Sequence, residues 1–247
     1  MYAEDLAYIQ HAGYGDFARS AAPGLLRLLG DAAIDRGLVV DLGCGAGVWL
    51  RELTRAGYDA FGIDASAALV RFAREAAPEA RVRRGSAFAS ALPRCEAITA
   101  IGEVLSYCPS GRPAPSYERL FRRVARSLRP GGLFLFDLMV EGAPMAYRTF
   151  SEGSDWAVLS EVSEQRQRRR LVREITTFRR VGSGYRRGHE RHEQRVASRR
   201  RIEASLRAAG FTVRASRRYG SFELAPRRLA FLARRVRGRG DARMLGP

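Results

Sequence analysis

The sequence predicts an α/β fold with a mostly parallel sheet. Residues 38–42 form a short, mostly apolar run, which is typical of a strand buried on both faces. A glycine-rich turn follows, and residues 48–56 have the pattern of a helix. A second apolar run at residues 60–63 ends at Asp64. This order of strand, glycine loop, helix, strand and acid is the first half of a nucleotide-binding α/β unit.

Glycine occupies every second position of the turn after the first strand, at Gly43, Gly45 and Gly47. Glycine lets the chain turn sharply and lets a ligand approach the backbone with no Cβ in the way. Because the loop opens at the start of a helix, free N–H groups point at the ligand. Asp64 is then placed to accept hydrogen bonds from ribose hydroxyls. The dinucleotide fingerprint G-x-G-x-x-G would need a glycine at position 48, where the chain has Val48.

The spacing from Asp41 to Gly47 is D-x-G-x-G-x-G, which resembles motif I of the class I, Rossmann-like S-adenosylmethionine-dependent methyltransferases. An Arg-Pro-Gly-Gly turn at residues 129–132 and an L-x-x-A-G-F junction at residues 206–211 resemble the same family. The resemblance implies a mostly parallel seven-stranded sheet with an antiparallel last strand. It also implies S-adenosylmethionine as the cofactor and S-adenosylhomocysteine as its product. The alternative for the glycine loop alone is a structural turn of another α/β protein.

The rest of the chain divides into four expected parts. The N-terminal lid helices take residues 1–30, with one helix reaching Phe17 and a second one beginning at Pro23. The methyltransferase core takes residues 31–139 and 201–237. Residues 140–200 are expected to be an inserted substrate cap, and residues 238–247 a disordered tail.

Further elements follow in order along the chain. A helix capped by Ser66 precedes the third strand. The remaining core strands are expected at residues 80–84, 96–101, 133–139, 211–219 and 229–235. Within the insert, three runs alternate between apolar and polar residues and predict an antiparallel β-meander, at residues 156–162, 170–180 and 185–196.

Composition limits the partners and the chemistry. The formal net charge is +17, and all 43 basic residues are arginine. Such a charge attracts anions without specifying one, so nucleic acid is the second choice of partner. The three cysteines, Cys44, Cys95 and Cys108, have no metal or disulfide spacing, and the three histidines suggest no metal site. With no visible secretory signal and no run of about 20 apolar residues, we expect a cytoplasmic protein without a membrane partner.

The resemblance places the cofactor at the carboxyl ends of the parallel strands. In the family, an acid after the third strand accepts from the adenine amino group, and Ser86 replaces that acid here. The expected cofactor residues are Asp41, Gly43, Cys44, Gly45, Gly47, Asp64, Ala65, Ser86, Ala87, Phe88, Ile101, Gly102, Glu103 and Tyr14.

The expected substrate residues come from the lid, the strand ends and the insert. They are His11, Phe17, Tyr107, Asp137 and Arg173. The aromatic residues of the lid, to which Tyr8 and Tyr14 also belong, suit a sulfonium cation and exclude water. Their alternative role is to hold the lid helix on the domain.

The insert supplies the candidate bases. In a strand, Glu190 and His192 share one face, whereas His189 and Glu193 share the other. We take the face of His192 as the cavity side, so His192 is the first candidate base and Glu103 the second, with His189 as a further catalytic candidate. Solubility of an exposed sheet is the alternative explanation for these residues.

The predicted function is methylation of a small molecule at O, N or C by direct displacement. Few aromatic residues lie among the arginines of the insert, which favours a small anionic or neutral substrate over a polynucleotide. The alternatives are an RNA or protein methyltransferase, a cofactor-binding protein without turnover, and a cyclase on the same fold. The protein is expected to be a monomer or a homodimer.

Overall fold

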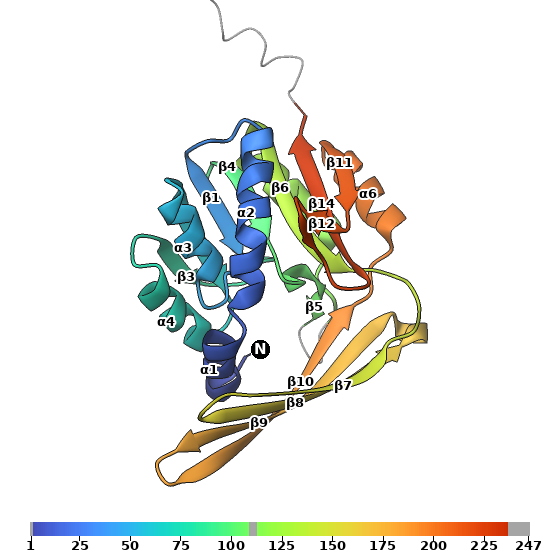
Figure 1. The fold of residues 1–247 in the computed structure, drawn as a ribbon. Coiled ribbons are helices and arrows are strands. Elements are labelled where there is room, and N and C mark those ends of the chain that lie inside the picture. Colours follow the sequence, from blue (N-terminus) through green and yellow to red (C-terminus); the bar gives the residue numbers. More distant parts are fainter. Residues whose placement is uncertain (1, 109–112, 237–247) are drawn as a thin grey trace, which may run out of the picture.

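The computed structural model describes residues 2–108 and 113–236, in which a central sheet with helices on both faces stands over a second, antiparallel sheet (Figure 1). The central sheet has seven strands in the order β11-β14-β6-β4-β1-β2-β3. β14 runs antiparallel to both of its neighbours, β6 and β11, and the other adjacent strands of this sheet are parallel. This topology confirms the predicted fold class. The strands are β1 (Leu38–Leu42), β2 (Asp59–Asp64), β3 (Arg81–Arg84), β4 (Cys95–Ala100), β6 (Leu128–Met139), β11 (Phe211–Ser216) and β14 (Arg228–Arg235).

Five helices cover the two faces of the central sheet. Helices α2 and α3 pack against one face of the sheet in a single apolar cluster, and α4 lies beside α3. Helices α5 and α6 pack against the other face in a second cluster. Ser66 caps α4 as predicted, because its Oγ accepts the N–H of Leu69. The helices are α2 (Asp16–Asp31), α3 (Val48–Arg55), α4 (Ala67–Ala76), α5 (Tyr117–Ser127) and α6 (Arg199–Ala208).

The N-terminal helices differ from the prediction. Helix α1 (Glu4–Gly13) ends before Tyr14, where two glycines flank a single residue, so it does not reach Phe17. Helix α2 begins at Asp16 and contains Pro23, so the prediction of a helix start at this proline is wrong. The missing N–H of a mid-helix proline is costly. Burial of the alanine and leucine face of α2 against the core offsets that cost.

The inserted segment forms most of a five-stranded antiparallel sheet in the order β5-β10-β9-β8-β7, which we call the cap sheet. The three predicted runs correspond to β8, β9 and β10. The prediction omitted β7, because all but one of its residues are exposed and no buried alternation marks it. It also omitted β5, which joins the edge of β10 from the core. The strands are β5 (Tyr107–Cys108), β7 (Ala146–Glu152), β8 (Trp156–Gln165), β9 (Arg170–Val181) and β10 (Gly184–Arg195).

Three short elements complete the described chain: the 3₁₀ turns η1 (Val104–Ser106) and η2 (Arg166–Arg168), and the hairpin of β12 (Arg218–Tyr219) and β13 (Phe222–Glu223). The tail expected at residues 238–247 lies outside the described residues. No helix within residues 2–108 and 113–236 has the length and apolar character needed to cross a bilayer.

Helix α1 links the cap sheet to the core. Its Leu6 and Ile9 pack in one cluster with apolar residues of β8 and β9, and its Ala7 packs with residues of α4. Asp5 accepts from Arg186, with an Nε to Oδ2 distance of 2.6 Å, and also from Arg179. The helix therefore holds the cap sheet near the carboxyl ends of the core strands.

Candidate active site

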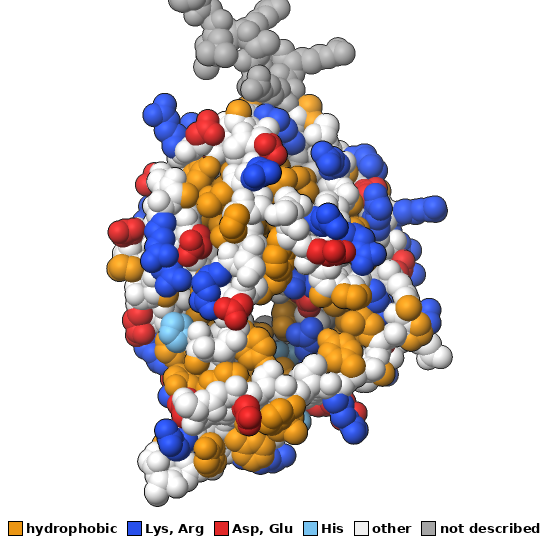
Figure 2. Space-filling model, in the orientation of Figure 1, with side chains coloured by type: hydrophobic (Ala, Val, Ile, Leu, Met, Phe, Trp, Pro, Cys, Tyr) orange, Lys and Arg blue, Asp and Glu red, His pale blue; other side chains and the backbone are white. Residues whose placement is uncertain are grey.

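A cavity of about 560 Å³ lies between the carboxyl ends of the core strands and the cap sheet. The space-filling view shows the hollow between these two parts (Figure 2). Predicted cofactor residues make up most of the core side of its wall: Asp41, Gly43, Cys44, Gly45, Asp64, Ala65, Ser86, Ala87, Phe88, Ile101, Gly102, Glu103 and Tyr14. Among the predicted substrate residues, Phe17, Tyr107 and Arg173 also lie on the wall.

The three glycines of the loop after β1 have different roles. A Cβ on Gly43 would lie 2.3 Å from Val104, and one on Gly47 would lie 2.8 Å from the Cα of Ala73. Both glycines are therefore required by packing, and Gly47 lies behind the cavity wall, not on it as predicted. A Cβ on Gly45 would meet no protein atom within 4 Å, although Gly45 lines the cavity with φ +55°. Gly45 is thus the position at which the loop leaves backbone open to a ligand.

Asp64 closes β2 directly beside this loop. Its carboxylate is buried and accepts the N–H of Gly45 at 3.0 Å and the N–H of Ser66 at 2.8 Å. Burial is the largest effect on this group and raises its pKa. An acid fixed by two backbone donors at the cavity wall has lone pairs left for sugar hydroxyls, so the residues present fit a ribose.

Asp41 lies deeper, at the end of β1. Its Oδ1 accepts the hydroxyl of Thr99 at 2.7 Å, and the Thr99 Oγ1 accepts the indole N–H of Trp49 at 3.1 Å. Burial raises the pKa of Asp41 to about 7. This chain of polar groups fixes the floor of the cavity.

A strained turn after β4 brings Glu103 into the cavity. Gly102 has φ +85° and Glu103 has φ +62°, and residues other than glycine rarely adopt this region of backbone conformation. Asp137 holds the turn, because its carboxylate accepts the N–H of Gly102 at 2.7 Å and the N–H of Glu103 at 3.0 Å. It also accepts from the Tyr219 hydroxyl at 2.6 Å and from Arg228 at 2.7 Å. Asp137 is fully buried and absent from the wall, so its predicted contact with the substrate is corrected to a structural role.

Glu103 is the second candidate base. Its carboxylate accepts the amide of Gln194 at 2.7 Å and lies 3.5 Å from Arg173 and 3.3 Å from Arg228. With two guanidinium groups and an amide around it, Glu103 is better placed to orient these groups than to take up a proton.

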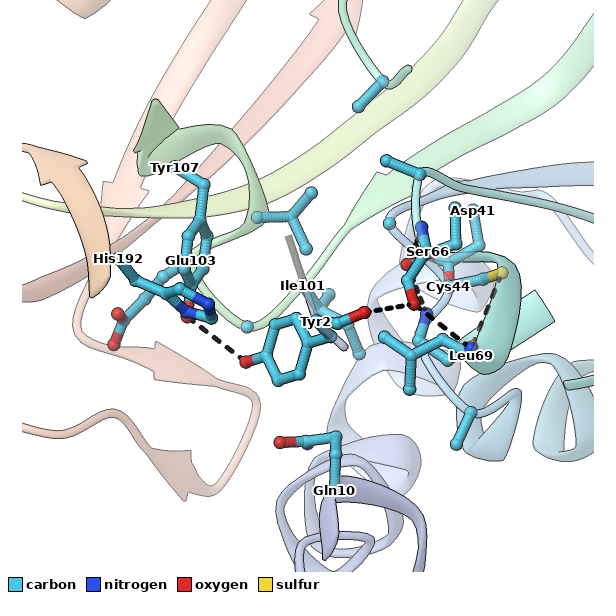
Figure 3. Close-up of a pocket in the computed structure, with 18 of the residues that line it drawn as sticks. Tyr2, Gln10, Asp41, Cys44, Ser66, Leu69, Ile101, Glu103, Tyr107 and His192 are labelled. Atoms are coloured by element: carbon cyan, nitrogen blue, oxygen red, sulfur yellow. Dashed lines mark hydrogen bonds between the residues drawn. The ribbon is translucent and has the colours of Figure 1, made fainter. Parts of the chain in front are cut away.

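His192 lies on the cavity wall with an exposed fraction of 4%. Its Nε2 is 2.8 Å from the Oε2 of Glu190, and its buried Nδ1 has no hydrogen-bond partner among the described residues. The ring packs edge-on against Tyr2 and Tyr107, at centroid distances of 5.1 and 5.7 Å. Figure 3 shows these three rings together at one end of the cavity.

Two other histidine predictions need correction. His189 faces the outer side of the cap sheet and pairs with Glu174 at 3.3 Å, so it lies away from the cavity. His11 is exposed and stacks on Phe72 of α4 at 4.6 Å, and it is also absent from the wall. Tyr8 likewise points elsewhere, since its hydroxyl donates to Asp155 at 2.7 Å. His11 and Tyr8 therefore have the other role considered for the lid aromatics, which is to hold α1 on the rest of the protein.

Tyr2 and Arg228 line the cavity without having been predicted. The Tyr2 carbonyl accepts the hydroxyl of Ser66 at 2.9 Å, and its own hydroxyl is 3.4 Å from that of Tyr107 (Figure 3). The N-terminal segment thus crosses from the core side to the cap side. Nothing local in the sequence marks Tyr2, because it precedes the first helix, and Arg228 is one arginine among many.

No cluster of three metal-ligating side chains occurs in the part of the chain that the structure describes.

Comparisons with known proteins bear on the identity of this cavity. Residues 39–132 match the model of a family described as a methyltransferase domain. A comparison with curated protein sequences finds no match.

Solved structures with the same fold are similar over nearly their whole length. An S-adenosylmethionine-dependent methyltransferase from Clostridium acetobutylicum has a TM-score of 0.78 at 16% identity, covering 93% of this chain and 97% of that chain. The sugar N-methyltransferase KedS8 from a Streptoalloteichus species has a TM-score of 0.78 at 19% identity, covering 96% and 95%. The amino pentose methyltransferase CalS10 from Micromonospora echinaspora has a TM-score of 0.71 at 18% identity, covering 96% and 98%.

Proposed function

We propose that this chain is a class I S-adenosylmethionine-dependent methyltransferase and that it methylates a hydroxyl or amine of a small molecule. The observation that carries the proposal is one cavity that extends from the glycine loop and Asp64 to His192. A volume of about 560 Å³ lies within the range of small-molecule sites. Two of the similar structures are described as a sugar and an amino pentose methyltransferase, which supports a small acceptor.

The core residues would hold S-adenosylmethionine. Asp64 would accept from the ribose hydroxyls, and the open backbone at Gly45 would lie against the ligand. The Ser86 Oγ accepts the N–H of Phe88 at 3.1 Å, which leaves its own O–H to donate to the adenine ring. When bound, S-adenosylmethionine supplies a methyl group whose carbon–sulfur bond breaks with both electrons passing to sulfur.

The residues of the cap sheet would prepare the acceptor. The lone pair of the acceptor's oxygen or nitrogen would form the new bond to the methyl carbon. The proton that this acceptor atom loses would pass to His192. Tyr107 and Phe17 would exclude water from this end of the cavity. Arg173 would orient a polar group of the acceptor, because its guanidinium is already held by Glu103.

The arginine-rich surface gives less support to a nucleic-acid substrate. Several arginines of the cap sheet pair with acids: Arg148 with Glu161, Arg191 with Glu174, and Arg186 with Asp5. On the face drawn in Figure 2, basic and acidic side chains are interspersed. Such a surface differs from the continuous basic groove that binds a polynucleotide backbone.

Methyl-labelled S-adenosylmethionine tests this function with a panel of amino sugars, sugars and aminoalcohols, next to RNA and arginine-rich protein. We expect label in a small molecule only. His192→Gln should lower turnover by about 10²- to 10⁴-fold and leave the affinity for S-adenosylhomocysteine unchanged. His189→Gln, on the outer face of the same strand, is the matched control and should retain full turnover. Label found only in RNA or protein, or full turnover of His192→Gln, would contradict the proposal.

A further inference from the structure

We propose that Glu190 is a positioning residue that fixes the tautomer of His192, and that the backbone N–H of Ala3 completes this pair. The inference rests on the proposed function in taking His192 as the proton acceptor. It concerns three groups: the carboxylate of Glu190 in β10, the imidazole of His192 two residues further on, and the backbone N–H of Ala3 before α1.

The contact between the two side chains determines which ring nitrogen carries a proton. Glu190 and His192 lie on the same face of β10, and the distance from Oε2 to Nε2 is 2.8 Å. An ionised carboxylate only accepts hydrogen bonds, so Nε2 must carry the proton in this contact. In the neutral ring the lone pair is then on Nδ1.

The environment of Nδ1 fits a group reserved for the acceptor. Nδ1 is buried and has no hydrogen-bond partner among the described residues. Leaving a buried polar atom without a partner is unfavourable, and a polar group of the acceptor that reached Nδ1 would satisfy it. The edge-on contacts with Tyr2 and Tyr107 fix the plane of the ring.

The second oxygen of Glu190 binds the N-terminal segment. Its Oε1 accepts the N–H of Ala3 at 3.0 Å, and Ala3 is the residue before α1. Helix α1 is itself held by the contacts of Asp5 with Arg179 and Arg186. Since Tyr2 crosses the cavity from the same segment, docking of this segment both covers the cavity and sets the position of the carboxylate. The base is therefore oriented only when the N-terminal segment is in place.

The neighbouring charges do not compete for these contacts. Arg173 lies opposite His192 in the register of β9 and β10, but its charge is paired with Glu103. Arg191 and Glu193, on the other face of β10, pair with each other and with Glu174. Glu190 is thus left to His192 and Ala3.

Imidazole ¹⁵N–¹H correlation spectra test the inference directly and need no substrate. The chain has three histidines, so His192→Gln identifies the signals of His192 by their loss. In the wild-type protein we expect the Nε2–H form of His192. Glu190→Gln should give a mixture of both forms, because an amide can donate to the ring as well as accept from it.

Two further variants sharpen this test. Glu174→Gln changes the other histidine–glutamate pair, on the outer face, and should alter the signals of His189 only. Ala3→Pro removes the N–H that Glu190 accepts, and the φ of −75° at this position suits proline. Ala3→Pro should change the tautomer populations of His192 in the same direction as Glu190→Gln does. A wild-type Nδ1–H form, or an unchanged Nε2–H form in Glu190→Gln, would overturn the proposal, and unchanged His192 signals in Ala3→Pro would overturn the role of the N-terminal segment.

Turnover separates this inference from the proposed function. With an acceptor identified, Glu190→Gln should lower kcat by about 10- to 100-fold, as for carboxylates that orient metal-bound histidines, with the KM of S-adenosylmethionine unchanged. If His192→Gln stopped turnover while Glu190→Gln had the wild-type kcat, the positioning role would fall and the function would stand. If His192→Gln kept full turnover, the function of His192 would fall whatever its tautomer.

Discussion

Replacing Asp64 with asparagine should weaken S-adenosylmethionine binding without unfolding the protein. The carboxylate accepts two backbone N–H groups and would also accept the ribose hydroxyls. Asparagine keeps the shape and one acceptor oxygen but loses the charge. The loss of one charge-assisted hydrogen bond costs about 1.5–3 kcal/mol, which corresponds to roughly a 10- to 100-fold higher Kd. Because burial raises the pKa of Asp64, removing its charge also removes a desolvation cost, which limits the effect on folding.

Isothermal titration calorimetry with S-adenosylhomocysteine measures this effect. Asp59→Asn is the matched control, because Asp59 begins the same strand on the exposed side, away from the cavity. The control should keep the wild-type Kd. Equal affinity of Asp64→Asn and the wild type, or an equal loss in both variants, would refute the ribose role of Asp64.

Three further predictions follow from the same geometry. Gly45→Ala should lower the affinity for S-adenosylhomocysteine more than Gly57→Ala does. Both glycines have positive φ and open space for a Cβ, but only Gly45 faces the cavity. Equal calorimetric affinities of the two variants would contradict a contact between the ligand and the backbone of Gly45. Asp41 has its pKa raised to about 7 by burial, so the folded protein keeps a proton that the unfolded chain loses, and the stability due to that proton is lost as pH rises from about 4 to about 7. At pH 8, Asp41→Asn should therefore be more stable than the wild type by on the order of 4 kcal/mol, whereas near pH 4 the two should differ little. If thermal denaturation of the ligand-free proteins gave the same stability difference at both pH values, this prediction would be contradicted. Asp137→Asn should destabilise the fold by about 3–5 kcal/mol, because buried Arg228 loses the nearer of its two carboxylate partners and the turn of Gly102 loses a charged acceptor. Tyr219→Phe should cost only about 1–3 kcal/mol, and similar losses of the two variants in urea would show that the charge of Asp137 contributes little.

The contact between the glycine loop and Asp64 could be predicted because its parts are contiguous in sequence. The loop with Gly45 and the acid Asp64 both lie within residues 38–64, and one strand–helix–strand unit brings them together. That Glu190 and His192 share one face followed from strand periodicity, since β10 pairs with β9 over twelve residues without a bulge; the choice of that face as the cavity side did not. In such a strand the alternation of faces is fixed once one residue is placed.

The parts that the sequence did not reveal depend on contacts between distant segments. Asp137 was expected at the substrate because it ends a strand, but β14 brings Arg228 to its carboxylate and the turn of Gly102 needs it as an acceptor. Tyr2 reaches the cavity only through the docking of α1 on the cap sheet. The strand β7 has no buried alternation because it is the exposed edge of that sheet. Periodicity within one segment cannot indicate such tertiary contacts.

A crystal structure with S-adenosylhomocysteine would show where the ribose and the sulfur lie in the cavity. We predict ribose hydroxyls within hydrogen-bond distance of Asp64, the ligand against the backbone of Gly45, and the sulfur turned toward the end of the cavity that holds Tyr107 and His192. A ribose far from Asp64, or a sulfur turned away from His192, would contradict this prediction.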